Sequence, residues 1–185
     1  MAAEPDFDPK FVRFLVLFNR DRDYYDCHDV MEELWLEEGR NRFWQGLLQV
    51  AVGLHHYGNR NYTGAAKLLR AALEKLDGYA DTEAGIDVKR LREEAAAVLG
   101  PLEAWLAEAG TGPGDGRGAG QDDGRDAGQG AGAGPDAGGE ADFKAARRPP
   151  EPGPFEIRIV DRRLAERVAA EMKRPPGGDS RADET

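Results

Sequence analysis

The chain contains a single cysteine, Cys27, and no long apolar run, and both shortages restrict what the protein can be. One cysteine excludes an intrachain disulfide and a cysteine-rich zinc site. A helix that crosses a membrane needs about 20 consecutive apolar residues, and no segment approaches that length. The first residues are acidic and polar, which predicts no signal peptide. These features together predict a cytoplasmic protein.

Positive charge is also scarce, because 25 Lys and Arg residues stand against 35 Asp and Glu, a formal net charge of −10. A protein that binds the nucleic-acid backbone needs a basic face, and so does one that binds an anionic membrane. The acidic composition therefore predicts neither nucleic acid nor membrane as a partner. A small ligand, a protein partner and a homo-oligomer all stay open.

Large apolar residues are absent from a glycine-rich stretch in the second half of the chain. Thirteen of the 24 glycines lie between Gly110 and Gly139. Such a segment cannot bury enough apolar surface to offset the entropy lost when its backbone is ordered. We therefore predict three parts: a helical domain at 1–109, a disordered Gly/Asp/Ala-rich linker at 110–150, and a short appendage at 151–185.

The appendage combines two patterns in a small space. Phe155, Ile157 and Ile159 alternate with polar residues as in a strand, and an amphipathic helix with Leu164 and Val168 follows. The segment is too short to fold alone, and its end is expected to be disordered. Docking on the domain, binding to a partner and ordering only on binding are all open.

The first 109 residues carry apolar side chains at helical spacing, which predicts a compact all-α bundle of about five to six helices. Asp8 and Pro9 predict the start of the first helix, because aspartate caps helices and proline favours the first helical position. The second helix is expected to begin after Asp23 and to end before Gly39. The remaining helices are expected at 41–57, at 62–76, from Asp87 and, after a break at Gly100 and Pro101, at 102–110.

A cluster of polar and aromatic residues lies in "YYDCHDVMEELW", residues 24–35. His28 and Glu32 are four residues apart and therefore share one face of a helix. Gln45 and Gln49 have the same spacing on the next, mostly apolar helix. A buried amide without a partner costs on the order of 1–3 kcal/mol, so we expect the two glutamines to bond with His28 and Glu32. The candidate site comprises Tyr24, His28, Asp29, Glu32, Trp35, Gln45 and Gln49.

Three interpretations of this cluster compete. It can be a buried polar network that fixes helix packing, an aromatic-lined pocket for a ligand, or a metal or acid–base site. A metal would need more ligands than one His/Glu pair, and no HExxH motif is present. The weak metal candidates are His28, Glu32, His55 and His56. No cofactor is predicted, and a divalent metal belongs to the third interpretation only.

Two longer stretches carry a family resemblance. "FNRDRDYYDCHDVMEELW" and "FWQGLLQVAVGLHHYGNRNYTGAAKLLRAALEKL" resemble the DUF309 family of small helical proteins from bacteria and archaea, over roughly residues 8–105. Asp29 stands where the family usually has glutamate. The resemblance implies an all-α bundle and no particular reaction, because the family has no assigned function. The matching positions are Phe18, Asn19, Tyr24 or Tyr25, His28, Asp29, Glu32, Trp35, Gln45, Gly46, Gln49, Gly58, Asn59, Gly64 and Ala65.

The sequence thus favours a non-catalytic binding or scaffold domain with a polar, aromatic-lined pocket or network around His28 and Glu32. The alternative is a metal-dependent or acid–base enzyme, similar to a hydrolase, that uses the same residues. Whether the protein is an enzyme stays undecided at this point.

Overall fold

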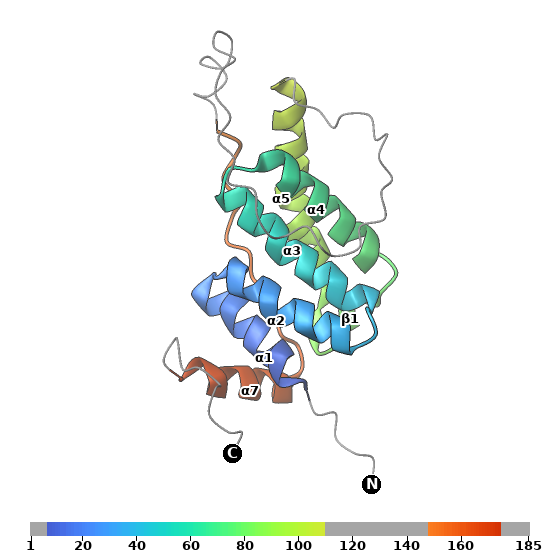
Figure 1. The fold of residues 1–185 in the computed structure, drawn as a ribbon, viewed down its shortest axis with the longest axis vertical. Helices are drawn as coiled ribbons and strands as arrows, with labels where there is room; N and C mark the ends of the chain where they lie inside the picture. The colour runs from blue at the N-terminus through green and yellow to red at the C-terminus, as the bar shows by residue number, and fades with distance from the viewer. Residues whose placement is uncertain (1–6, 110–147, 175–185) are drawn as a thin grey trace.

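The computed structural model describes residues 7–109 and 148–174. Within these ranges the chain forms six α-helices, one π-helix and one two-stranded sheet, which confirms the predicted all-α bundle (Figure 1). The predicted linker at 110–150 lies outside the described residues except for its last three positions. The end of the appendage, 175–185, lies outside them as well. None of the described helices has the length and apolar character that a membrane crossing requires.

The α-helices follow the order that the sequence predicts, and the structure adds two elements, a short two-stranded hairpin and, at the end of the first helix, a π-helix. The π-helix carries the chain from α1 toward α2. The two short strands form a hairpin just before the last helix of the bundle. The bounds are α1 Pro9–Val16, η1 (the π-helix) Leu17–Asp21, α2 Tyr24–Glu37, α3 Arg42–Gly58, α4 Tyr62–Leu76, β1 Thr82–Glu83, β2 Ile86–Asp87, α5 Val88–Glu108 and α7 Arg162–Met172.

Asparagine and aspartate side chains begin the α-helices. Each accepts a hydrogen bond from a backbone N–H in the first turn, which would otherwise lack a partner. Asp8 confirms its predicted role by accepting from the Lys10 N–H at 2.7 Å, with Pro9 at the first helical position. The other capping residues are Asp23, Asn41, Asn61, Asp87 and Asp161.

The predicted break at Gly100 and Pro101 is wrong, because α5 continues through both residues to Glu108. Proline removes one backbone donor, which usually kinks or ends a helix. Here Leu99 and Leu102 on either side are buried in the core, so packing holds the helix together across the missing hydrogen bond.

The core is centred on α3, which packs against α2 on one side and α4 on the other (Figure 1). Two buried glycines of α3 allow the close approach to α4. A Cβ atom at Gly46 would lie 2.8 Å from the side chain of Leu76, and one at Gly53 would lie 3.0 Å from that of Leu69. Larger residues there would push α4 outward.

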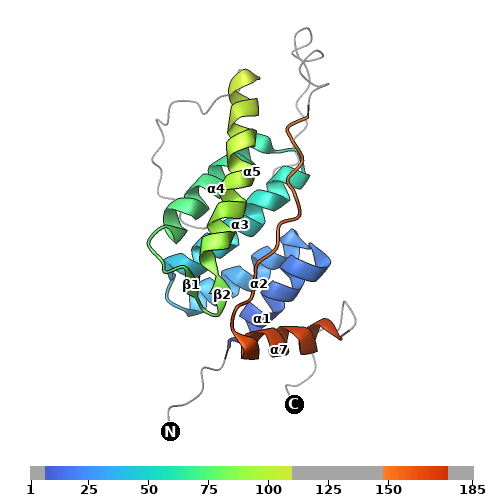
Figure 2. The ribbon, with the colours of Figure 1, turned by 180° about the vertical axis from the view of Figure 1, so that it is seen from behind.

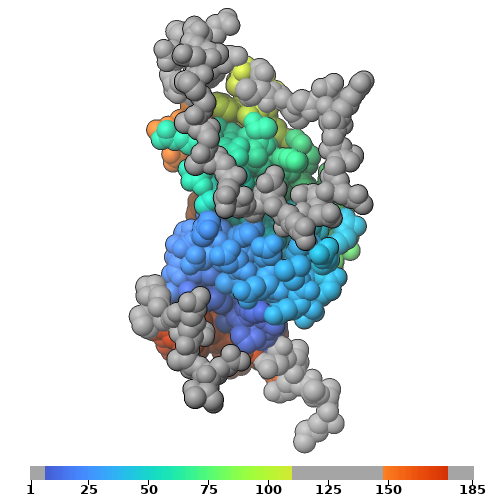
Figure 3. Space-filling model, viewed as in Figure 1, coloured from blue at the N-terminus to red at the C-terminus, as the bar shows by residue number. Residues whose placement is uncertain are grey.

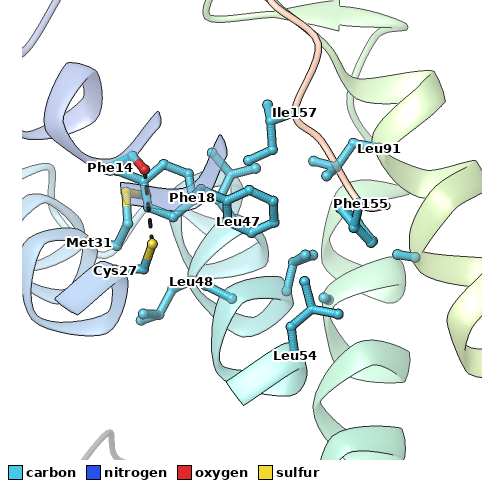
Figure 4. Close-up of a cluster of buried hydrophobic side chains, with 14 of the residues drawn as sticks. Phe14, Phe18, Cys27, Met31, Leu47, Leu48, Leu54, Leu91, Phe155 and Ile157 are labelled. Carbon is cyan, nitrogen blue, oxygen red and sulfur yellow. Dashed lines mark hydrogen bonds between the residues drawn. The ribbon is translucent and has the colours of Figure 1, made fainter. Parts of the chain in front are cut away.

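The appendage docks on the bundle. Residues 148–161, called the arm below, run in an extended conformation along the side of the bundle away from α2 and lead into α7 (Figure 2). Phe155 and Ile157 insert between η1, α3 and α5, beside Phe18, Leu47 and Leu91 (Figure 4). α7 then packs against α1. Of the three outcomes left open by the sequence, the structure has docking on the domain.

Candidate functional site

The predicted pair His28 and Glu32 lies on a partly open face of α2. His28 Nε2 is 3.7 Å from Glu32 Oε2, and His28 Nδ1 is 3.1 Å from Asp29 Oδ1. The exposed fractions of the three side chains are 22%, 33% and 65%, in the order His28, Glu32, Asp29. Atoms of α2 and of the start of α3 form the surface on this side of the molecule (Figure 3). A protonated His28 could pair with either carboxylate.

The expected hydrogen bonds between the glutamines and this pair are not formed. Gln49 Oε1 is buried and has no hydrogen-bond partner among the described residues, and the same holds for Trp35 Nε1. Gln45 is half-buried. The prediction of one bonded network across α2 and α3 is therefore wrong in its hydrogen bonds. The hydrogen bonds are missing because apolar residues fill the contact between α2 and α3. These residues are Cys27, Met31, Leu47 and Leu48, which lie in the core.

Tyr24 and Cys27 face other parts of the structure. The Tyr24 ring meets the Phe18 ring edge-on at 5.2 Å and lines a cavity beside the arm, to which His28 and Glu32 do not contribute. Cys27 is buried in the core, and this burial raises the pKa of its thiol. The cysteine is therefore a core side chain and not an activated nucleophile.

The metal candidates on α3 lie near the C-terminal end of that helix. Asn59 Nδ2 is 2.8 Å from His55 Nε2, and Asn61 Nδ2 is 2.8 Å from His56 Nδ1. Burial lowers the pKa of His56. Within 7–109 and 148–174, no three or more His, Cys, Asp and Glu residues come together as a metal site would require. Metal binding by His28, Glu32, His55 and His56 stays a prediction.

A separate group of long-range polar contacts lies where the arm crosses the bundle. Asn19 Nδ2 donates to the Ile157 carbonyl at 2.9 Å, and the Ile157 N–H donates to Asn19 Oδ1 at 2.9 Å. The Arg22 guanidinium donates to the Phe155 carbonyl, and the Tyr57 hydroxyl donates to the Pro150 carbonyl. Three side chains of the bundle thus bind backbone groups of the arm.

The arm continues by pairing with the hairpin. The Asp87 N–H donates to the Arg158 carbonyl at 2.9 Å, and Ile159 forms a β-bridge with Ile86. The carbonyl of Gly85 then accepts two N–H groups, from Val160 at 2.9 Å and from Asp161 at 3.0 Å. A Cβ atom at Gly85 would lie 2.9 Å from Asp161 Cβ, so this close approach requires glycine.

The helix that follows the arm is also tied down. Leu164 and Val168 are buried against the bundle. Arg20 Nη1 donates to the carbonyl of Met172 at 2.6 Å, and Arg167 donates to the carbonyl of Phe7 at 2.8 Å. The docked surface therefore extends over both the arm and α7.

Sequence reasoning missed most of this surface. Asn19 was noted in the sequence only as a position of the family pattern, and Arg22 and Tyr57 belong to no motif that was recognised there. The alternation of Phe155 and Ile157 was the one signal on the other side, since it indicates an extended segment with one face buried.

These features define a class of protein: an all-α bundle with an extended arm docked across it. Residues 11–68 match the family model described as "Domain of unknown function (DUF309)", which confirms the resemblance seen in the sequence. The family match is limited to that stretch, which is less than half of the chain. The stretch contains Asn19, Arg22, His28, Glu32 and Tyr57, whereas the arm and α7 lie outside it.

Two curated relatives are similar to the chain. "Uncharacterized protein YpuF" of Bacillus subtilis is 35% identical over 98 residues, which are 50% of this chain and 56% of that protein. An "Uncharacterized protein" of Aquifex aeolicus is 29% identical over 84 residues, which are 44% of this chain and 25% of that protein. The chain thus spans about half of the first relative and a quarter of the second. No solved structure matches. None of these comparisons assigns an activity to the matched residues.

Proposed function

We propose that the helical domain is a non-catalytic binding module whose groove takes up an extended peptide segment, and that the arm is the segment bound in this chain. The proposal keeps the function class that the sequence favours. It moves the binding surface from His28 and Glu32 to the groove formed by η1, α3, α5 and the β1–β2 hairpin.

The single observation that carries the proposal is the pair of hydrogen bonds between Asn19 and Ile157. The two bonds, at 2.9 Å each, satisfy both backbone groups of one residue of the arm. A carboxamide used in this way binds an extended backbone without regard to its side chain. Together with the Ile86–Ile159 bridge, it resembles recognition by strand addition, in which main-chain bonds supply affinity.

Side chains of the arm supply the second requirement, which is specificity. Phe155 and Ile157 are 4% and 1% exposed, whereas the intervening Glu156 and the following Arg158 are exposed. Alternate residues of an extended peptide point to the same side, so two positions enter pockets and the others face solvent. The groove therefore selects peptide segments with the sequence Phe-x-Ile. A protein partner with such a segment would compete with the arm.

Peptide exchange tests the proposal. A protease site inserted between residues 109 and 148 of the full chain allows the covalent connection to be cut after folding. A fluorescent synthetic peptide of residues 148–174 is then added in excess, and its uptake is followed by anisotropy. We expect the cut arm to stay bound and to exchange with the labelled peptide.

Two variant peptides sharpen the experiment. Truncation of a buried phenylalanine costs about 3–5 kcal/mol, so a Phe155→Ala peptide should compete at least about 100-fold more weakly. A Val160→Ala peptide is the matched control, because Val160 is 45% exposed, and it should compete as well as the unchanged peptide. If the bundle unfolds when the arm leaves, or if the cut arm never exchanges, the arm is part of the core and the proposal fails.

A further inference from the structure

A cavity of about 490 Å³ lies beside the first residues of the arm, where they pass the C-terminal end of α3. Its wall contains three arginines, Arg22, Arg60 and Arg148, and three tyrosines, Tyr24, Tyr57 and Tyr62. The volume falls in the range of roughly 300–1,000 Å³ that is typical of small-molecule sites. The cavity shares Arg22, Tyr57 and Phe155 with the peptide groove proposed above, and its space lies beside the arm. The predicted pair His28 and Glu32 does not line it.

The charge of the cavity is opposite to that of the protein. Three guanidinium groups stand against one carboxylate, Glu151, in a chain whose formal net charge is −10. The Arg22 guanidinium donates to the Phe155 carbonyl and is held in place by it. The side chains of Arg60 and Arg148 have no hydrogen bond or ion pair with any described residue. Two of the three cations therefore have no partner within residues 7–109 and 148–174.

The backbone at two of these arginines is unusual. Arg22 has φ 55° and Arg60 has φ 63°, in the left-handed region that favours glycine and asparagine. Arg40 has the same φ of 63°. Its guanidinium lies 5.6 Å from the centre of the Trp35 ring, so the Arg40 side chain has a contact within the protein. At Arg60 the left-handed backbone ends α3, because the Arg60 N–H donates to the Tyr57 carbonyl at 3.0 Å and the Asn61 N–H donates to the His56 carbonyl at 2.9 Å. The Arg60 side chain, by contrast, has no contact of this kind with a described residue.

The aromatic part of the wall is well ordered by ring contacts. Tyr57 and Tyr62 meet edge-on at 5.4 Å, and Tyr62 meets Trp105 edge-on at 5.2 Å. The Tyr57 hydroxyl is fixed by its bond to Pro150, and burial raises the pKa of Tyr57 to about 12. These rings offer apolar surface to a flat group, and the raised pKa keeps Tyr57 neutral near pH 7.

We infer that this cavity binds a small ligand that carries both a phosphate group and an aromatic ring, the chemistry of a mononucleotide. Guanidinium groups match phosphate oxygens in charge and in the geometry of their paired N–H donors. Tyrosine rings pack against a flat base. The inference goes beyond the proposed function, because the ligand lies beside the arm and requires no exchange of it.

Calorimetric titration of the full chain tests this inference with four probes: adenosine monophosphate, uridine monophosphate, adenosine and inorganic phosphate. We expect at least one nucleotide to bind with a Kd below 1 mM and at least tenfold more tightly than both adenosine and phosphate. If neither nucleotide binds at 1 mM, or if inorganic phosphate binds as tightly as the nucleotides, the inference is wrong.

Arg60 and Arg40 provide a matched pair of variants. Arg60→Gln removes a cation of the cavity, and a charge-assisted hydrogen bond lost in this way should weaken nucleotide binding about tenfold or more. Arg40→Gln changes the same residue type at the same φ outside the cavity and should leave binding unchanged. Arg148→Gln tests the second free cation without touching the left-handed turn. Binding that survives both cavity variants, or that falls equally in Arg40→Gln, would overturn the assignment.

Discussion

The two polar regions of this protein differ in how far along the chain their partners lie. On the outer face of α2, His28 contacts Asp29 and Glu32, one and four residues away. In the groove, Asn19 bonds to Ile157 and Arg22 to Phe155, across more than a hundred residues. The first region follows from the geometry of a single helix. The second exists only once the whole chain has folded.

The comparison shows which polar residues determine the tertiary structure. Contacts within one helix turn form in any α-helix, so they say little about tertiary structure. A side chain that satisfies the backbone of a distant segment fixes the position of that segment. The groove residues should therefore matter more for stability and binding than the conspicuous cluster on α2, and three substitutions test this order.

The largest effect is expected from Asn19→Ala. The substitution leaves both backbone groups of the buried Ile157 without their partner, which should lower the free energy of unfolding by about 1–3 kcal/mol. Urea unfolding measures the loss, and faster amide hydrogen exchange at Ile157 locates it. Asn59→Ala is the control, because Asn59 is exposed and contacts only its own helix turn. An equal loss in both variants would contradict the special role of Asn19.

The local part of the fold could be predicted from the sequence because its causes are local. Asp8, Asp23 and Asp87 cap the helices that they were expected to cap, and Gly39 follows α2 with φ 67°. Pro101 was the exception. Its effect depended on the burial of its neighbours, which no single-helix rule supplies.

The groove could not be predicted because no pattern in the sequence connects its two sides. Asn19 lies where the helical pattern of the first segment fails, and the structure has a π-helix there. The alternation of Phe155 and Ile157 predicted an extended segment with one buried face, yet it did not indicate which surface would receive the two side chains. Within the candidate site, Trp35 is buried as expected, whereas the bonds expected for Gln49 are not made. Pairing across α2 and α3 depends on packing that spacing alone does not encode.

A smaller effect, of opposite sign, is expected from Gln49→Met. Gln49 Oε1 is buried without a partner, so an apolar side chain of similar length should raise the free energy of unfolding by about 1 kcal/mol. Gln45→Met is the control at a half-buried position of the same helix and should change stability less. Thermal and urea unfolding of both variants measure the difference. A clear loss of stability in Gln49→Met would mean that the oxygen has a partner in solution, and the polar network would return as the better interpretation.

The smallest effect is expected from His28→Ala. Ion pairs near the surface contribute about 0–1 kcal/mol, and the pair with Glu32 is at 3.7 Å and partly open to solvent. The free energy of unfolding should therefore change by less than about 1 kcal/mol, with Glu33→Gln on the same helix as the control.

The His28→Ala variant also tests the enzyme alternative. For this test the unchanged protein and the variant are purified without chelator and analysed for bound metal. Near-stoichiometric metal in the unchanged protein that is lost in His28→Ala would reverse the comparison, because the α2 cluster would then be a metal site and the groove a structural support for it. Equal metal content in both proteins, with little change in stability, would leave the groove as the region on which binding depends.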